Sequence, residues 1–272
     1  MISDDRIREM ADDLAAVAGV RAVALGGSRA RGTHRPDSDV DLGVYYDDDL
    51  DLRALEAVAA RWNGQAIPVV GPGGWGPWVD GGAWSTVDGT AVDWILRDVG
   101  RVVEQCERAR RGEFAFHPQP GHPFGFLDVA YAGEVAMCVP LRDDHGFLAQ
   151  TAARVTPYPE PLRAAMLRNL WQADFLLDGA KKGADGADAA YVALCATTAA
   201  MLIAHAWHAA AGQWVTNEKN LVPHVASLPV DTRGFAELAA SVLGDLGTTP
   251  ERLHAALAAL RDAPRPALSP ER

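Results

Sequence analysis

The first 155 residues alternate between short apolar runs and segments with helical spacing. Apolar residues three and four positions apart predict an opening helix: Ile7, Met10, Leu14 and Val17. Strand-like runs follow at residues 20–25 and 39–44. A hairpin is predicted over residues 83–96, because Asp88-Gly89 is a favoured two-residue turn between two apolar runs.

Other segments of this half are less regular. Further helices are expected from Asp47-Asp48-Asp49 to Asn63-Gly64 and at residues 98–111 and 128–139, and a short strand at residues 67–70. The acidic run Asp47-Asp48-Asp49 is expected to cap the helix that follows it, since acids favour a helix N-terminus. Residues 112–126 hold three prolines and are predicted to form a loop.

A proline-rich segment, residues 156–161, divides the chain. Everything beyond it has helical spacing, and helices are expected at 162–177, 189–211, 217–228, 232–243 and 249–261. The predicted class is therefore α/β (α+β), with a mixed-sheet domain at 1–155, a helical domain at 156–263 and a disordered tail at 264–272.

Charge is unevenly distributed. The net charge is −11, and residues 1–150 hold 14 Lys and Arg against 24 Asp and Glu. Such an acidic surface disfavours DNA or RNA as a substrate and would attract a cationic one.

The compartment is expected to be the cytoplasm. Cys106, Cys138 and Cys195 have no CxxC spacing and are predicted to be reduced thiols, and no secretion signal opens the chain. Residues 189–212 lack charge, but their alanine content predicts a buried bundle helix and no membrane partner.

The strongest chemical signal is a glycine turn followed by two aspartates. Gly27 and Ser28 come after the first apolar run, and glycine lets backbone N–H groups approach an anion closely. Asp39 and Asp41 stand two positions apart in the next strand, so they share a face. Two carboxylates on one face suit Mg²⁺, which takes carboxylate, water and phosphate oxygens.

This pattern of Gly27-Ser28, ten residues, and Asp39-Val40-Asp41 resembles the signature of the nucleotidyltransferase superfamily with a polymerase-beta-like palm. The helical second half makes the chain similar to the antibiotic nucleotidyltransferases, of the kanamycin, lincosamide and streptomycin types. The resemblance covers about the first 100 residues and is loose beyond them.

The resemblance implies a third acid on a later strand, and Asp93 stands in the middle of an apolar one. The alternative is a structural Asp93 paired with Arg97. It also implies a glutamate near the acceptor as general base, for which Glu134 is the best placed. A glutamate on the exposed face of its helix is the open alternative.

The predicted reaction moves a nucleoside monophosphate from an NTP, ATP first among them, to a hydroxyl and releases pyrophosphate. Two Mg²⁺ ions would lie on Asp39, Asp41 and Asp93. Gly27 and Ser28 would hold the phosphates, and the loop arginines would neutralise pyrophosphate: Arg29, Arg31 and Arg35.

The expected acceptor is a small molecule of the aminoglycoside or lincosamide kind, which would make the protein an antibiotic-resistance enzyme, a monomer or homodimer. Two alternatives stay open: an enzyme that modifies a protein or tRNA, and an inactive nucleotide-binding module. Residues 71–76 match GxGxxG only formally, because Pro77 prevents the helix that a dinucleotide site needs. Residues 71–82 are expected to form a flexible loop whose Trp75 and Trp78 either cover a ligand or pack on the sheet.

Overall fold

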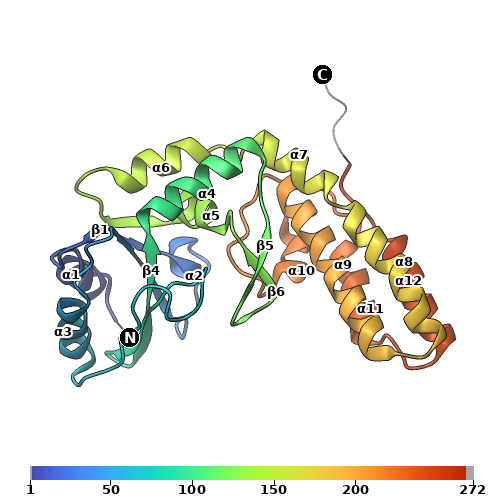
Figure 1. Cartoon of the computed structure of the whole chain (residues 1–272), viewed down its shortest axis with the longest axis horizontal. Helices are drawn as coiled ribbons and strands as arrows, with labels where there is room; N and C mark the ends of the chain where they lie inside the picture. The colour runs from blue at the N-terminus through green and yellow to red at the C-terminus, as the bar shows by residue number, and fades with distance from the viewer. Residues whose placement is uncertain (1, 268–272) are drawn as a thin grey trace. The chain divides into compact units, whose positions relative to one another are not determined.

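The computed structural model describes residues 2–267 (Figure 1). The chain forms two compact units that meet in sequence close to the proline-rich segment. The first contains the residues up to Ala109 and Phe114–Thr156, and the second contains Arg110–Glu113 and the residues from Pro157 onward.

A five-stranded mixed sheet organises the first unit. Its order is β3 (Gly82–Val87), β4 (Thr90–Asp98), β2 (Val40–Tyr46), β1 (Val20–Leu25) and β7 (Val139–Arg142). Strands β2 and β4 run parallel, and the other neighbours are antiparallel. The predicted fold class, a mixed sheet with flanking helices followed by a helical region, is confirmed.

Helices surround this sheet. They are α1 (Asp4–Ala15), α2 (Gly27–Ala30), α3 (Leu52–Asn63), α4 (Val99–Arg111), α5 (Ala130–Met137) and α6 (Phe147–Val155). The cap of α3 is Asp51, whose side chain accepts a bond from the Ala54 N–H at 3.0 Å. The expected cap at residues 47–49 is therefore wrong, because the chain continues as a turn before the helix begins.

The two faces of the sheet differ in character. One face carries Val40, Leu42 and Val44 into a core shared with α1 and α3, where Trp94 donates its indole N–H to Met10 at 3.2 Å. By alternation, the other face carries Asp41 and the residues at positions 43 and 45. The carboxylates of the candidate site therefore leave the sheet on this second face.

Two further local predictions were wrong, and two elements were not predicted. The expected loop contains a hairpin, β5 (Phe116–Gln119) and β6 (His122–Leu127), whose prolines are tolerated because each strand of a two-stranded sheet is an edge. The expected strand at 67–70 is reduced to one bridge between Val70 and Gly82. Strand β7 and helix α6 were not foreseen, since their apolar runs are short.

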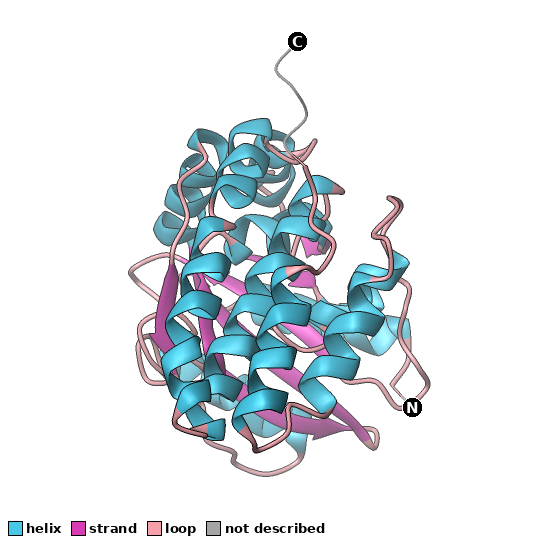
Figure 2. Ribbon diagram, turned by 90° about the vertical axis from the view of Figure 1, so that its right-hand side faces the viewer, coloured by secondary structure: helices cyan, strands magenta, loops and turns pink. Residues whose placement is uncertain are grey.

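The second unit is helical, and Figure 2 shows its helices packed alongside one another. It contains α7 (Glu160–Arg168), α8 (Trp171–Asp185), α9 (Ala189–Ala210), α10 (Leu221–His224), a 3₁₀ turn (Val225–Ser227), α11 (Phe235–Gly244) and α12 (Pro250–Arg261). The single helix expected at 162–177 is divided between α7 and α8. The helix expected at 217–228 shortens to α10 and the 3₁₀ turn.

The start of the predicted disordered tail is tied to this unit. The Trp207 indole donates to the Pro264 carbonyl at 3.2 Å, and Arg265 pairs with Asp174 at 2.8 Å. Residues 264–267 therefore depart from the prediction, and residues 268–272 lie outside the described part of the chain.

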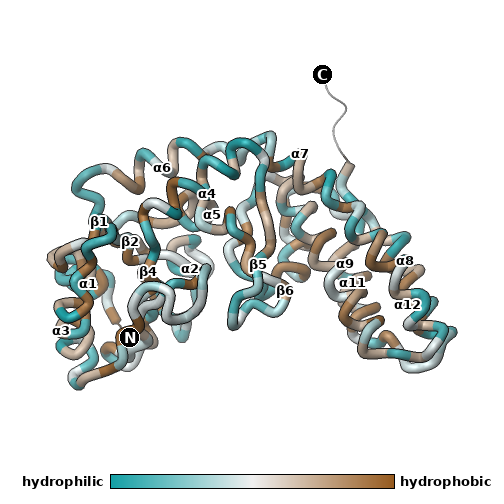
Figure 3. The backbone as a smooth tube through the Cα atoms, in the orientation of Figure 1, coloured by the Kyte–Doolittle hydropathy of each residue, from teal (hydrophilic) through white to brown (hydrophobic). Residues whose placement is uncertain are grey.

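Helix α9 is the central helix of this unit. It is long and apolar enough to cross a membrane by length and composition, and it shows as hydrophobic in Figure 3. More than half of its most apolar stretch is buried inside the protein, as expected of a core helix. Burial lowers the pKa of His205 to about 3, helped by neighbouring His208.

Candidate active site

Asp41 and Asp93 lie side by side. They are direct partners in the parallel pair of β2 and β4, so both side chains leave the same face of the sheet. Neighbouring strands are about 5 Å apart, which places the two carboxylates within reach of one cation. The sequence predicted both residues, and the register brings them together.

The glycine turn packs directly on Asp41. The Gly26 N–H donates to the Asp41 carbonyl at 2.8 Å, and Gly27 has φ +61° at the start of α2. A Cβ placed on Gly27 would come within 1.8 Å of Asp41 Oδ2. Only glycine therefore fits here, both for its backbone conformation and for the carboxylate beside it.

Arg29 fastens the loop that precedes β2. Its Nε donates to the Asp39 carbonyl at 3.1 Å, and its terminal nitrogen donates to the Ser38 carbonyl at 3.0 Å. Arg29 was predicted as a phosphate ligand, and these bonds give its guanidinium a second task, which is to position Asp39. Asp39 itself is exposed and precedes the first residue of the strand.

Arg31 and Arg35 are exposed in the same loop. The Arg35 N–H donates to the Ser38 hydroxyl at 2.9 Å, and the Ser28 carbonyl accepts from the Thr33 N–H at 3.0 Å. These bonds shape the loop through its backbone. They leave the side chains of Arg31 and Arg35 at the surface, where an anion can reach them.

The residues present fit a magnesium ion through a pair of carboxylates. Mg²⁺ takes one or two protein carboxylates and completes its shell with water and phosphate oxygens, and Asp41 with Asp93 supplies such a pair. Within residues 2–267, no group of three or more His, Cys, Asp or Glu is arranged to hold a metal. Asp39, which was predicted with Asp41 as the first pair of ligands, is exposed and precedes the first residue of β2.

Glu134 forms a bidentate ion pair with Arg97. The Arg97 Nε and terminal nitrogen lie 2.6 and 2.7 Å from the two Glu134 oxygens, and the Arg97 side chain is 6 % exposed. Burial by itself lowers the pKa of Arg97, and the Glu134 carboxylate more than offsets it, so the pKa rises above its usual value. This pair joins β4 to α5 on the same sheet face as Asp93.

The segment 71–82, expected to be flexible, is held by buried polar side chains. Gln119 accepts from the Trp78 N–H at 2.9 Å and donates to the Trp75 carbonyl at 2.8 Å. Buried Asp80 accepts from the Tyr46 hydroxyl at 2.9 Å and pairs with Arg101 at 3.0 Å. Trp78 stacks on His117, with ring centroids 4.0 Å apart, so it packs against the protein.

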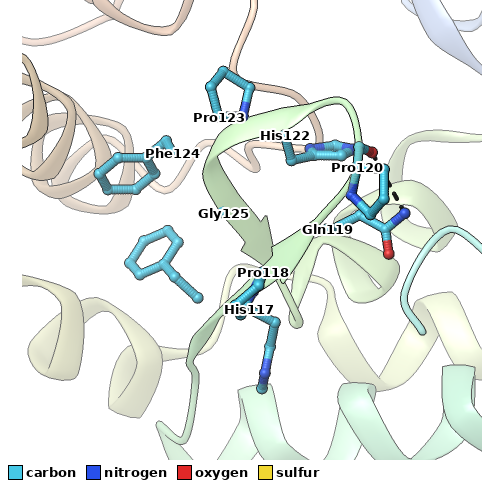
Figure 4. Close-up of a pocket in the computed structure, with 9 residues that line it drawn as sticks. His117, Pro118, Gln119, Pro120, His122, Pro123, Phe124 and Gly125 are labelled. Atoms are coloured by element: carbon cyan, nitrogen blue, oxygen red, sulfur yellow. Dashed lines mark hydrogen bonds between the residues drawn. The ribbon is translucent and has the colours of Figure 1, made fainter. Parts of the chain in front are cut away.

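A cavity of 620 Å³ is lined by residues 116–120 and 122–125 of the β5–β6 hairpin. Figure 4 shows Gln119 and Phe124 on opposite sides of the hairpin. Gln119 reaches away to the 71–82 segment, which ties this hairpin to the loop near the sheet.

Three residues that shape this region were not predicted from the sequence: Arg97, Gln119 and Trp84. The sequence indicates Arg97 only as a partner of Asp93, Gln119 lies in an expected loop, and Trp84 has no feature that distinguishes it from other hairpin residues. Trp84 is directly opposite Asp93 across the β3–β4 pair and is 64 % exposed. The predicted hairpin register already paired positions 84 and 93, and that was the available signal.

Comparison with known proteins identifies the fold of the site. Residues 6–70 match the family model described as nucleotidyltransferase domain, a stretch that includes Gly27, Asp39 and Asp41. The match covers about a quarter of the chain, so residues 6–70 are similar to a nucleotidyltransferase domain. The predicted enzyme class, a nucleotidyltransferase, is thereby confirmed.

One solved structure is similar in outline. It is the crystal structure of a nucleotidyltransferase-like protein from Exiguobacterium sibiricum, with 13 % identity and a TM-score of 0.45 over 94 % of this chain and 72 % of that one. No curated protein matches the chain.

Proposed function

We propose that this nucleotidyltransferase transfers the nucleoside monophosphate of an NTP, with ATP as the favoured nucleotide, to the hydroxyl of a small molecule. The observation that carries the proposal is the pairing of Asp41 with Asp93 across two parallel strands, with the Gly27 turn packed on Asp41. Carboxylates placed beside a glycine turn match a triphosphate that arrives with its divalent ion.

Asp41 and Asp93 would hold Mg²⁺, with Asp39 as the third ligand and two ions as the expected number. When bound, such ions polarise the phosphorus and stabilise the attacking and leaving oxygens. Gly27 and Ser28 would orient the β- and γ-phosphates. Arg31 and Arg35 would offset the charge of the departing pyrophosphate from their exposed positions.

The acceptor proposed is a small cationic molecule, as in aminoglycosides and lincosamides, and the enzyme would then confer antibiotic resistance. Support comes from the excess of 24 acidic over 14 basic residues in positions 1–150. Such a surface repels polyanions and draws cations. Glu134 stays a proposed general base that must first exchange its bond to Arg97 for one to the acceptor hydroxyl.

The decisive experiment is incubation of the protein with each NTP, Mg²⁺ and a panel of aminoglycosides and lincosamides. Mass spectrometry would detect an acceptor that gains one nucleoside monophosphate, and pyrophosphate release would be measured in parallel. A nucleotide found instead on a protein or on tRNA would replace the small-molecule acceptor with the alternative one. No transfer to any acceptor, together with unchanged NTP binding in Asp41→Asn, would contradict the proposal.

A further inference from the structure

An exposed aromatic side chain stands next to the site. Trp84 on β3 is the cross-strand partner of Asp93 on β4. Directly opposed residues of an antiparallel pair leave the same face, with Cβ atoms about 5 Å apart. Trp84 therefore borders the carboxylate pair, yet 64 % of its surface is open to solvent.

A second indole lies against the first. Trp75 and Trp84 are stacked, with ring centroids 4.4 Å apart and planes 15° from parallel. The Trp75 ring also passes 3.2 Å from the position where a Cβ of Gly82 would stand. The same Cβ would come within 1.8 Å of the Trp94 carbonyl oxygen, so a side chain at Gly82 would meet the β4 backbone as well as the Trp75 ring.

The backbone of Trp75 is held in place. Its backbone N–H donates to the Asp80 carbonyl at 3.2 Å, and its carbonyl accepts from the Gln119 side chain at 2.8 Å. Asp80 and Gln119 are both buried. An aromatic surface on an ordered backbone loses less conformational freedom when a ligand covers it, which favours binding.

The strand order indicates which reactant would meet this surface. Counting from the Gly27 turn beside β2, the next strands are β4, with Asp93, and β3, with Trp84. In an in-line displacement the attacking oxygen enters opposite the leaving pyrophosphate. With the phosphates at the Gly27 turn, the acceptor approaches from the side of β4 and β3.

We propose that the stacked Trp75–Trp84 pair is the acceptor subsite and selects hydroxyl compounds that carry a ring with an apolar or planar face. The ring lies on the exposed indole of Trp84, and its hydroxyl points to the carboxylate pair. An amino group on the ring adds attraction to the indole face and to Asp93. That the ring compound is the acceptor rests on the proposed function. The aromatic surface itself rests on the structure alone.

Binding can be tested without the true acceptor. Saturation-transfer NMR would compare ring probes, methyl glucoside, glucosamine and kanamycin, with the open-chain polyol sorbitol, on the full chain without NTP. We expect the ring probes to bind and sorbitol not to. In Trp84→Ala the dissociation constant should rise about 5- to 30-fold, as loss of one aromatic contact predicts, and Trp84→Phe should keep most of the affinity.

The matched control is Trp171→Ala, which removes an indole of similar exposure, 61 %, from α8. It should leave ring binding unchanged, and both variants should keep the melting temperature of the parent. Equal binding of sorbitol and ring probes, no binding of any ring probe, or unchanged affinity in Trp84→Ala would overturn the proposal. So would a change from dimer to monomer in Trp84→Ala by light scattering, because the surface would then be a contact between copies.

The nucleotide-transfer assay separates this inference from the function. If ring probes bind through Trp84 but no NTP is consumed, the proposed function fails and the ring site stands. If transfer occurs with an unchanged acceptor KM in Trp84→Ala, the function stands and the subsite is elsewhere.

Discussion

Gly27 lies so close to the Asp41 carboxylate that no side chain fits at this position. Gly27→Ala would place a methyl group on the Asp41 carboxylate at a backbone angle of φ +61°. Gly32 has a similar angle, φ +68°, with nothing within 4 Å of its added Cβ. We expect both alanine variants to lose roughly 1 kcal/mol of unfolding free energy from backbone strain, and only Gly27→Ala to lose turnover, by at least about tenfold.

Denaturant unfolding and the nucleotide-transfer assay would measure the two effects. Equal turnover in both glycine variants would show that the Asp41 carboxylate can move without cost, and the close packing of the turn would then have no catalytic meaning.

Asp41 and Asp93 are expected to be indispensable to transfer. Asp41→Asn and Asp93→Asn should each reduce turnover by at least about 100-fold, because an amide is a poorer magnesium ligand than a carboxylate and metal assistance is worth several kcal/mol. Asp41→Asn should also weaken magnesium-dependent NTP binding by calorimetry. Asp48→Asn, an exposed aspartate after β2, is the control and should retain parental activity.

One variant distinguishes between two roles for Glu134, which are ion-pair partner of Arg97 and general base. Glu134→Gln leaves Arg97 buried without its anionic partner, so we expect a loss of about 3 kcal/mol in unfolding free energy, the low end for a buried pair because Glu134 is partly exposed. A fall in turnover of roughly 10² to 10⁴-fold at unchanged stability would instead assign it the role of general base. A variant with parental stability and turnover would remove both roles.

At the scale of elements, the loop between α2 and β2 depends on Arg29. Its bonds to the carbonyls of Ser38 and Asp39 hold the loop against α2. We expect Arg29→Ala to lower turnover about 10-fold or more by releasing Asp39. Arg31→Ala, at an exposed arginine of the same loop, should raise the KM for NTP by a few-fold, and more at low salt, because exposed charges are screened.

Steady-state kinetics at two ionic strengths would distinguish these effects. If Arg29→Ala changes only the KM for NTP, with the same salt dependence as Arg31→Ala, then Arg29 contacts phosphate and does not position the loop.

At the scale of the whole molecule, the helical unit is expected to weaken in acid. Burial lowers the pKa of His205 from 6.5 to about 3, and the pKa of His208 is lowered in the same direction. As the pH falls, the two histidines therefore take up protons in the unfolded chain before they do so in the folded one. Stability is complete above pH 6.5 and is lost as the pH falls towards 3, by up to about 1.4 kcal/mol per unit for His205.

Urea unfolding followed by circular dichroism at pH 7 and pH 5 would test this. The loss of unfolding free energy between the two pH values should be roughly 1–2 kcal/mol smaller in His205→Gln than in the parent. The control variant His34→Gln, at an exposed histidine, should show the same loss of unfolding free energy as the parent. An equal loss in parent and His205→Gln would show that His205 does not set the acid response.

The sequence by itself determined the order of the elements and the chemistry of the site. Period and turn signals were sufficient for the β3–β4 hairpin and for most of the helices, because local spacing determines which face of each element is buried. Gly27, Asp39 and Asp41 lie within 15 residues of one another, so their spacing in the sequence was enough to predict that they belong to one site.

Only the tertiary structure decided which distant residues meet. The register of β2 against β4 brings Asp93 to Asp41, the β5–β6 hairpin sends Gln119 to the Trp75 loop, and buried Arg97 takes both oxygens of Glu134. These contacts join residues 37 to 52 positions apart, and no local periodicity encodes them. They form because the sheet pairs strands across intervening helices and loops, and buried polar groups must find partners.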